Sequence, residues 1–427
     1  MSGRRLDSMK ENVRRIVESN GMRIVLEHIP HVRSCSIGVW VSRGSRHEPA
    51  DKIGISHFLE HMVFKGTGRR SAKQIASDIE SVGGSIDAFT GREYTCFHAR
   101  VLDEYVELAV DVLSDLVADP TVAEENIERE KHVVFEEIRN MEDTPDDMIH
   151  QLYSRALWGD DPLGYPLLGT YETVESLKRA DVLDYLHNQY SASNFVISLA
   201  GNIDVSATVE LIRDKFSFLS SRSGNGGGKT TNSSLIDPER FKPESRHLDR
   251  DCQQTHLCLG TVSFAHSDPR RYALLLLSNI IGGGMSSRLF QRVREEEALA
   301  YVVYSFQQFY VDTGLYGVYV GTEPSQRDRT IAIVHEEYKK ILDQGVNEEE
   351  LLHAKNQLKG QLLIGLESTT TRMFRLANFE INGEGYQPVD RVIEKINSAG
   401  PEDIRRVAEL ILDPRRICSV SLGPNHG

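Results

Sequence analysis

The chain alternates short apolar runs with longer amphipathic stretches, and the same order occurs twice. Residues 35–42 read CSIGVWVS and residues 255–263 read THLCLGTVS, so each is an apolar run of the length of a buried strand. A turn and a helical pattern follow each run: the first helix surrounds His57, and the second covers residues 271–281. We therefore expect a strand followed by a helix near the start of each half of the chain.

Further along each half, a long helix begins in a corresponding place, near Val122 in the first half and near Val346 in the second. Each half thus reads as strand, helix, strands, helices. This order is typical of α+β domains, in which helices pack on one face of an antiparallel sheet. The sequence therefore predicts two homologous domains that resemble α/β sandwiches.

A polar segment separates the two halves. Residues 220–234 read SSRSGNGGGKTTNSS and contain no aliphatic or aromatic side chain, a composition typical of a flexible linker. We expect an N-terminal domain over residues 1–219, a Gly/Ser-rich linker over residues 220–245, and a C-terminal domain of the same fold over residues 246–427.

Composition agrees with two globular domains and excludes some functions. The chain has 427 residues, more than one ordinary hydrophobic core accommodates. Its net charge of −14 argues against nucleic-acid binding as the main role. Five cysteines are scattered without a C-x-x-C pair, which predicts free thiols in a reducing compartment.

Two further features bear on the compartment. Residues 1–20 lack the apolar region of a secretory signal. The longest apolar run, residues 272–277, is too short to span a bilayer. We therefore expect a cytoplasmic protein that does not interact with a membrane.

The strongest chemical signal is the pattern His57-x-x-Glu60-His61. Histidines four residues apart lie on one face of a helix, and a carboxylate beside them suits a Zn²⁺ site whose water needs a base. The alternative is a pair of histidines on the surface or satisfied in the core. The flanking residues are largely apolar, so the helix is expected to be buried, where unpartnered polar groups are costly. This favours a metal site.

A catalytic zinc usually has three protein ligands, so the third should come from another element. The helix around residues 128–140 offers Glu130 and Glu137, which are two helical turns apart on one partly apolar stripe. The other members of that stripe are Val133, Val134, Ile138 and Met141. Solvated positions are the preferred interpretation for the remaining glutamates of this helix, namely Glu124, Glu125, Glu128 and Glu136.

At this point the chain resembles a known family. HFLEHMVFKGT and ENIEREKHVVFEEIRNMEDTP are similar to the motifs of the pitrilysin, insulinase and mitochondrial processing peptidase family, the inverted zincins. The resemblance is greatest to its short-chain, bacterial processing-peptidase-like branch. It covers almost the whole chain, including GSRHE at residues 44–48, GSIDAFT at residues 84–90 and GGGMSSRLF at residues 282–290.

The resemblance implies roles for individual residues. His57, His61 and Glu137 would bind one Zn²⁺ per chain. Glu60 would be the general base that activates water and then protonates the leaving amine. Glu130 would hold His61 or the ligand network in orientation. The second half has only residues 274–278 at the place of this motif, and they cannot hold a metal.

The resemblance also implies residues for substrate. Arg294 and Tyr301, which by themselves read as a surface charge and the start of a strand, would stabilise the oxyanion. The strand that contains Asp87, Ala88 and Phe89 would be an exposed edge to which the peptide adds, although an ordinary core strand is an equally good interpretation of the last two residues. The family often has Asn in place of Asp87, so the added charge could favour basic substrates.

The predicted activity is therefore that of a zinc-dependent endopeptidase acting on unfolded peptides or N-terminal extensions. Long members of the family enclose substrate with four such domains, whereas this chain has two. We therefore expect a homodimer with shared sites, in which Arg294 and Tyr301 serve the zinc of the partner; a heterodimer is the alternative. Other roles that the family leaves open are a catalytic subunit that needs an inactive homologous partner, and a non-catalytic structural subunit.

Overall fold

The computed structural model describes residues 11–220 and 243–425, and its contacts divide them into two compact units. Both units are discontinuous in the sequence. Of the described residues, the first unit contains 11–139, 165–220 and 365–388, and the second contains 140–164, 243–364 and 389–425.

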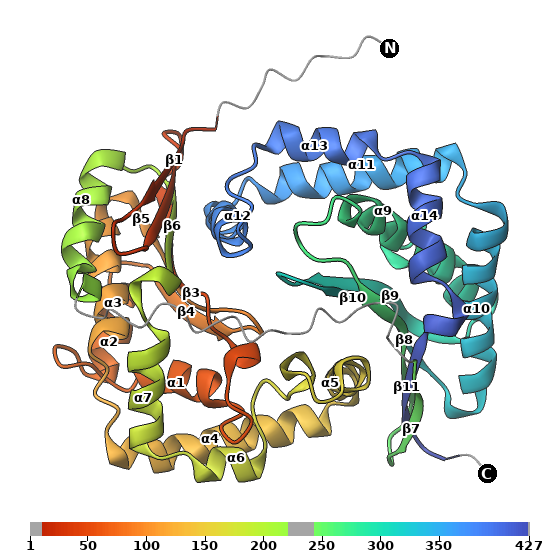
Figure 1. Cartoon of the computed structure of the whole chain (residues 1–427), viewed down its shortest axis with the longest axis horizontal. Helices are drawn as coiled ribbons and strands as arrows, with labels where there is room; N and C mark the ends of the chain where they lie inside the picture. The colour runs from red at the N-terminus through yellow and green to blue at the C-terminus, as the bar shows by residue number, and fades with distance from the viewer. Residues whose placement is uncertain (1–10, 221–242, 426–427) are drawn as a thin grey trace. The chain divides into compact units, whose positions relative to one another are not determined.

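The first unit is built on a six-stranded sheet with the strand order β1-β2-β6-β3-β5-β4 (Figure 1). Its strands are β1 (Val13–Val17), β2 (Arg23–His28), β3 (Ser34–Val41), β4 (Ser85–Thr90), β5 (Thr95–Leu102) and β6 (Phe195–Gly201). Its helices are α1 (Ile55–Val63), α2 (Ala72–Glu80), α3 (Val106–Ala118), α4 (Glu124–Asp143, whose last turn falls in the second unit), α6 (Tyr171–Ser176), α7 (Arg179–Gln189), α8 (Val205–Lys215) and α12 (Thr369–Ile381).

The second unit repeats this plan with a five-stranded sheet of order β7-β11-β8-β10-β9. Its strands are β7 (Ser245–Asp249), β8 (Thr255–Ser263), β9 (Ala300–Phe309), β10 (Gly314–Thr322) and β11 (Cys418–Gly423). Its helices are α5 (Pro145–Trp158), α9 (Arg271–Gly282), α10 (Arg327–Gln344), α11 (Glu348–Gly365), α13 (Val389–Ser398) and α14 (Pro401–Ile411).

The two sheets correspond strand by strand. Taken in chain order, β7 to β11 occupy the same positions in their sheet as β2 to β6 do in theirs, and β1 is an addition to the first sheet. The predicted duplication is thereby confirmed, as are the strand-then-helix pairs β3–α1 and β8–α9. One detail differs from the prediction: the sheets are mixed, because β2 pairs with β6, and β7 with β11, in parallel.

Each sheet is covered on both faces, so the prediction of helices on one face was incomplete. On β3, Ile37 and Val39 point into the main core with α1 and α3, whereas Trp40 points to the opposite face. There it packs with Met373 and Leu376 of α12. Sequence periodicity does not indicate that α12 covers the first sheet, because this helix comes from the other half of the chain.

The second sheet receives α5 in the same way. Tyr153 and Leu157 of α5 pack with Cys258 of β8 and Val420 of β11, on the face opposite to α9. In the element order, α5 follows α4 as α12 follows α11, so corresponding helices cover the second face of the opposite half's sheet. The compact units therefore differ from the predicted contiguous halves, residues 1–219 and 246–427, in these two segments.

A glycine in the central strand of each sheet lets the covering helix approach closely. A Cβ atom on Gly38 of β3 would lie 2.5 Å from the sulfur of Met373, and one on Gly260 of β8 would lie 2.5 Å from Oη of Tyr153. Real Cβ contacts are not that short, so a side chain at either glycine would force these neighbours to shift.

Most of the predicted linker, residues 220–245, lies outside the described residues. Within residues 11–220 and 243–425, the helices are all too short or too polar to cross a bilayer.

Candidate zinc centre

Helix α1 places polar groups in an otherwise apolar element. Phe58, Leu59 and Met62 are fully buried in the main core of the first unit. His57 is only 8 % exposed, and His61 lies one turn further along, with its ring centroid 4.5 Å from that of His57. The two imidazoles therefore share one face of a mostly buried helix, as the four-residue spacing predicts.

Glu137 on α4 completes the cluster. One of its carboxylate oxygens is 3.5 Å from Nε2 of His57, and the other is 3.5 Å from Nε2 of His61. One ligand atom from each of the three residues lies within 4.8 Å of the others. In the described part of the chain, this is the one group of His, Cys, Asp or Glu side chains with such spacing. Two imidazoles and a carboxylate on separate elements are a ligand set typical of catalytic zinc.

The cluster fits a cation on independent grounds. Oε2 of Glu137 and Nδ1 of His57 are buried and have no hydrogen-bond partner among the described residues. A buried polar atom without a partner is costly, and a cation between the three side chains would engage the carboxylate oxygen. Burial, aided by the nearby His61, lowers the pKa of His57 to about 3, so this ring is neutral and has a lone pair to donate.

Glu130 lies behind His61. Its Oε2 is 3.2 Å from Nδ1 of His61, and its Oε1 is 2.7 Å from Nζ of Lys65. The side chain is 7 % exposed, so Lys65 supplies the charge that a buried carboxylate needs. Binding at Nδ1 directs Nε2 of the same ring toward Glu137, which is the usual way in which a second carboxylate orients a metal-binding histidine.

Glu60 points to the edge of the sheet. Its Oε2 accepts a hydrogen bond of 2.5 Å from the hydroxyl of Thr90, the last residue of β4. Burial raises the pKa of Glu60, and the negative charges of Glu137 and Asp87 act in the same direction, whereas Thr90 and His61 oppose it. A carboxylate with a raised pKa beside a group of metal-binding side chains has the properties of a general base.

Strand β4 is an edge strand, since β5 is its one neighbour in the sheet. Asp87 is exposed, whereas Phe89 packs edge to face with Trp40 and Phe374 at centroid distances of 5.9 Å. Ala88 is half-buried and packs against the main core. The structure thus combines the two interpretations of this strand: the backbone edge is unpaired within the described residues, and two of its side chains belong to a packed sheet.

Arg294 and Tyr301 lie together in the second unit, whereas the histidine cluster belongs to the first. The guanidinium of Arg294 stands 4.3 Å from the ring centroid of Tyr301 and donates to the backbone oxygen of that residue. Tyr301 is 72 % exposed and is the second residue of β9, the edge strand that corresponds to β4. Both side chains are therefore accessible to a ligand of the second unit.

The predicted core-facing stripe on α4 was wrong at one position. Val133 is 42 % exposed and does not face the core. The solvated glutamates are exposed as predicted.

Sequence reasoning missed Thr90 and Lys65 as partners of the cluster. Neither contact has a local signal, because Lys65 pairs with Glu130 on α4 and Thr90 with Glu60 on α1, so both depend on the fold.

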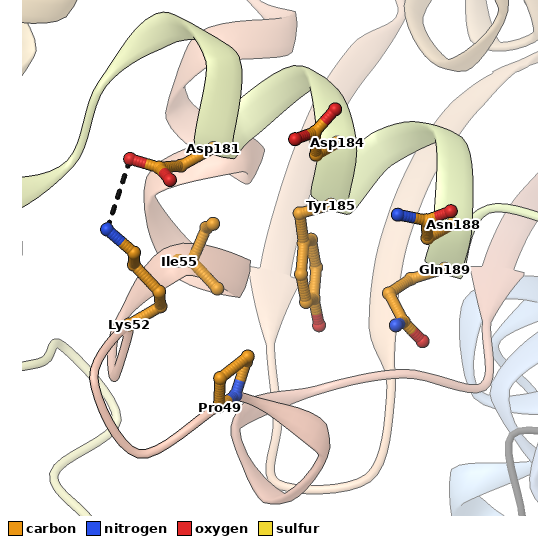
Figure 2. A pocket seen from close by; sticks show the side chains of 8 residues that line it. All are labelled: Pro49, Lys52, Ile55, Asp181, Asp184, Tyr185, Asn188 and Gln189. Carbon is orange, nitrogen blue, oxygen red and sulfur yellow. Dashed lines mark ion pairs between the residues drawn. The ribbon is translucent and has the colours of Figure 1, made fainter.

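Apart from these side chains, the first unit has a small surface hollow of about 200 Å³ between α7 and the segment before α1 (Figure 2). Tyr185 of α7 points down beside Pro49 and Ile55, and Lys52 forms an ion pair of 3.2 Å with Asp181. The residues of the zinc cluster do not line this hollow.

Comparisons with known proteins agree with this geometry. Residues 23–171 match the family profile described as insulinase (peptidase family M16), and residues 176–358 match the profile of the peptidase M16 inactive domain. The first match contains the histidine cluster and β4, and the second contains Arg294 and Tyr301.

Relatives are similar over nearly the full chain. An uncharacterized zinc protease of Bacillus subtilis, YmxG, is 42% identical over 93% of this chain and 95% of its own length. An uncharacterized zinc protease of Streptomyces coelicolor is 38% identical over 96% of this chain and 90% of its own length. A protease of Helicobacter pylori has the same fold, with a TM-score of 0.89 at 20% identity over 97% of this chain and 100% of that one. The chain therefore belongs to the insulinase family of peptidases, family M16.

Proposed function

We propose that this protein is a zinc-dependent endopeptidase that binds one Zn²⁺ per chain and cleaves unfolded peptides or N-terminal extensions. One observation carries the proposal: His57, His61 and Glu137 converge on one point, and Glu60 stands on the same helix as the two histidines. The relatives named zinc proteases support the metal and the reaction class.

The chain's residues divide the chemistry between them. When bound, zinc supplies Lewis acidity toward a carbonyl and lowers the pKa of water. Glu60 takes a proton from the attacking water and delivers it to the leaving amine, a transfer for which its raised pKa is suited. Glu130 keeps the His61 ring in one orientation through Nδ1. Arg294 and Tyr301 donate hydrogen bonds to the oxyanion.

The substrate binds as an added strand along β4. An unpaired strand edge offers backbone hydrogen bonds to any extended peptide, so affinity requires little sequence specificity. Thr90 at the end of β4 contacts Glu60, so a peptide on this edge would run toward the base. Folded proteins do not present such a strand, which explains the proposed preference for unfolded chains.

The central test combines metal analysis with hydrolysis of an unstructured peptide. The wild type should contain one zinc per chain and cleave the peptide. Glu60→Gln should keep the zinc and lose about 10²- to 10⁴-fold in kcat, because the base is gone and the ligands remain. A metal-loaded wild type that cleaves no peptide would contradict the proposal and would favour a catalytic subunit that needs a partner, or a binding role.

The third ligand has a matched control on the same helix. Glu137→Gln should lower zinc affinity by at least about tenfold, because a carboxylate ligand is lost. Glu136→Gln removes a neighbouring carboxylate that is 63 % exposed and paired with Arg139, so it should leave zinc affinity unchanged. The reverse result would assign the ligand to Glu136.

Asp87 gives a test of substrate class. Its exposed carboxylate on β4 should favour peptides with basic residues over neutral peptides of the same length. Asp87→Asn should remove that preference through KM while hydrolysis of the neutral peptide stays the same. An unchanged ratio of kcat/KM for the two peptides would rule out this role.

We further propose a homodimer whose sites are shared between chains, with Arg294 and Tyr301 of one chain serving the zinc of the other. Mixing Glu60→Gln chains with Arg294→Ala chains, each inactive alone, should restore activity, because each mixed dimer contains one site with both groups intact. No recovery after verified exchange of subunits would exclude sharing, and a wild type that is monomeric yet active would exclude the dimer.

A further inference from the structure

A buried carboxylate outside the zinc cluster holds the beginning of α1. Glu48 is 5 % exposed. Its Oε2 accepts a hydrogen bond of 2.7 Å from the backbone N–H of Gly54, and its Oε1 accepts one of 2.8 Å from the N–H of Ser56. These two residues flank Ile55, the first residue of the helix. Each carboxylate oxygen therefore binds a different N–H group at the positive end of α1.

The backbone is shaped for this contact. Gly54 has a φ of 95°, a left-handed conformation that glycine adopts readily, and a Cβ there would lie 2.7 Å from the backbone oxygen of Leu168. The segment from Glu48 to Gly54 thus returns on itself, so that the carboxylate reaches the helix that follows it. Such an arrangement fixes both the rotation of α1 and its position along its axis.

The outer side of the same segment is held by α7. Tyr185 shares a hydrogen bond of 2.8 Å with the hydroxyl of Ser56, and Lys52 pairs with Asp181 across the hollow (Figure 2). The Lys52–Asp181 pair is partly exposed and should contribute little. The buried contacts of Glu48 are therefore the stronger of the two attachments.

We propose that Glu48 is the positioning residue of the zinc-binding helix: its ionised carboxylate holds Gly54 and Ser56, and thereby sets where His57 and His61 present their nitrogens. This inference rests on the proposed zinc function, although its readout is metal affinity and needs no peptide. Glu48 itself touches neither the metal ligands nor Glu60 in the contacts of the described residues.

The charge of Glu48 is available near neutral pH. Burial raises its pKa to about 7, although the hydrogen bonds from Gly54 and Ser56 and the positive charge of Arg92 oppose the shift. The phenol of Tyr185 also interacts with it, and burial raises the pKa of that phenol, so it stays neutral. Protonation of Glu48 would weaken both hydrogen bonds, since acceptance by a charged oxygen is the stronger form.

The experiment compares zinc affinity of the full chain and of Glu48→Gln, measured by competition with a chelator between pH 6 and pH 8. The amide keeps the size but not the charge, so one of the two N–H groups loses its acceptor. At pH 8 the variant should bind zinc about 10- to 100-fold more weakly. The ratio of the two affinities should fall toward one as the pH is lowered from 8 to 6, because a growing share of the wild-type residue is then neutral as well.

A matched control and a second measurement keep the test decisive. Asp181→Asn breaks the outer ion pair and should give a ratio near one at every pH. In the metal-free wild type, the amide protons of Gly54 and Ser56 should shift with a midpoint at about pH 7, and zinc should move that midpoint to lower pH. This measurement needs no variant and remains informative if Glu48→Gln does not fold. An unchanged zinc affinity in Glu48→Gln, an equal loss at pH 6 and pH 8, or amide protons that do not titrate would each overturn the proposal. A wild type that binds zinc but cleaves nothing would instead contradict the proposed function alone.

Discussion

Helices α1 and α9 occupy the same place in the two units, between corresponding strands, yet their buried side chains differ. Helix α9 buries Leu274, Leu276 and Leu277 without exposure, whereas α1 carries His57 and His61 on a buried face. The apolar version shows that the fold does not need polar groups at this place. In the proposed function the histidines serve the zinc, and without a cation they should reduce stability.

The largest expected effect comes from giving α1 the character of α9. The double variant His57→Leu/His61→Leu should lose its zinc and fall by more than about 10³-fold in peptide hydrolysis, since a bound metal supplies several kcal/mol of transition-state stabilisation. Thermal unfolding of the metal-free variant should occur at the same temperature as that of the metal-free wild type, or above it. A metal-free variant that unfolds well below the wild type would mean that the histidines also serve the fold.

The converse variant, Leu274→His/Ser278→His, places the same spacing on α9. It should bind zinc much more weakly than the first unit does, because the described residues of the second unit contain no cluster like that of His57, His61 and Glu137. It should also lose several kcal/mol of stability through buried polar groups.

The helices that cover the second faces of the sheets differ in another way. Helix α5 packs through aromatic and aliphatic side chains, whereas α12 also carries buried charge: Arg372 pairs with Glu27 of β2, which is 3 % exposed. Glu27→Gln should destabilise the protein by about 3 kcal/mol, because it leaves Arg372 without its charge partner. Tyr153→Phe on α5 removes one neutral hydrogen bond, to the backbone oxygen of Tyr316, and should cost only about 1 kcal/mol. Urea unfolding would measure both, and equal losses would show that the charge is unimportant.

The parts of this molecule that sequence predicted are those encoded locally. Helix α1, α4 and the strands β3 and β8 follow from periodicity, and the spacing of His57 and His61 follows from the helix itself. The choice between Glu130 and Glu137 as ligand remained open on the stripe alone, because both face the same way and only the packing of α4 against α1 distinguishes their distances. The sequence has no local signal that α5 and α12 pack with the sheet of the opposite half of the chain, since this packing depends on contacts more than a hundred residues apart.

Helices α3 and α10 follow β5 and β10 in the two units. We expect the stability contributed by the buried carboxylate of α3 to depend more strongly on pH than that contributed by α10. Asp115 of α3 is 4 % exposed and binds Arg69, Arg70 and Thr67. Burial alone would raise its pKa, but these hydrogen bonds outweigh burial and lower the pKa below the ordinary 3.8. The stability that this shift contributes is complete above the unfolded-state pKa and is lost as the pH falls through the lower, folded-state value.

Asp115→Asn should therefore cost about 2 kcal/mol at pH 7, and the difference from the wild type should shrink as the pH approaches 2. Glu337 of α10 is also buried, but it pairs only with a half-exposed lysine, Lys340, among the contacts described for it. Glu337→Gln should thus cost less at pH 7. Urea unfolding at several pH values checks both, and a constant difference across pH for Asp115→Asn would exclude the linkage.

The smallest effect concerns the ends of the two edge strands. Strand β4 ends at Thr90, which donates to Glu60, whereas β9 ends at Phe309, which has no hydroxyl. Thr90→Val keeps the shape and removes the donor, so the carboxylate of Glu60 loses one fixed orientation. We expect kcat to fall about tenfold, the equivalent of one hydrogen bond of about 1.4 kcal/mol, with zinc content and KM unchanged. Thr90→Ser keeps the hydroxyl and should retain most of the activity. If Thr90→Ser and Thr90→Val had the same kcat, the role of Thr90 would be packing. The difference between the two strand ends would then have no effect on Glu60.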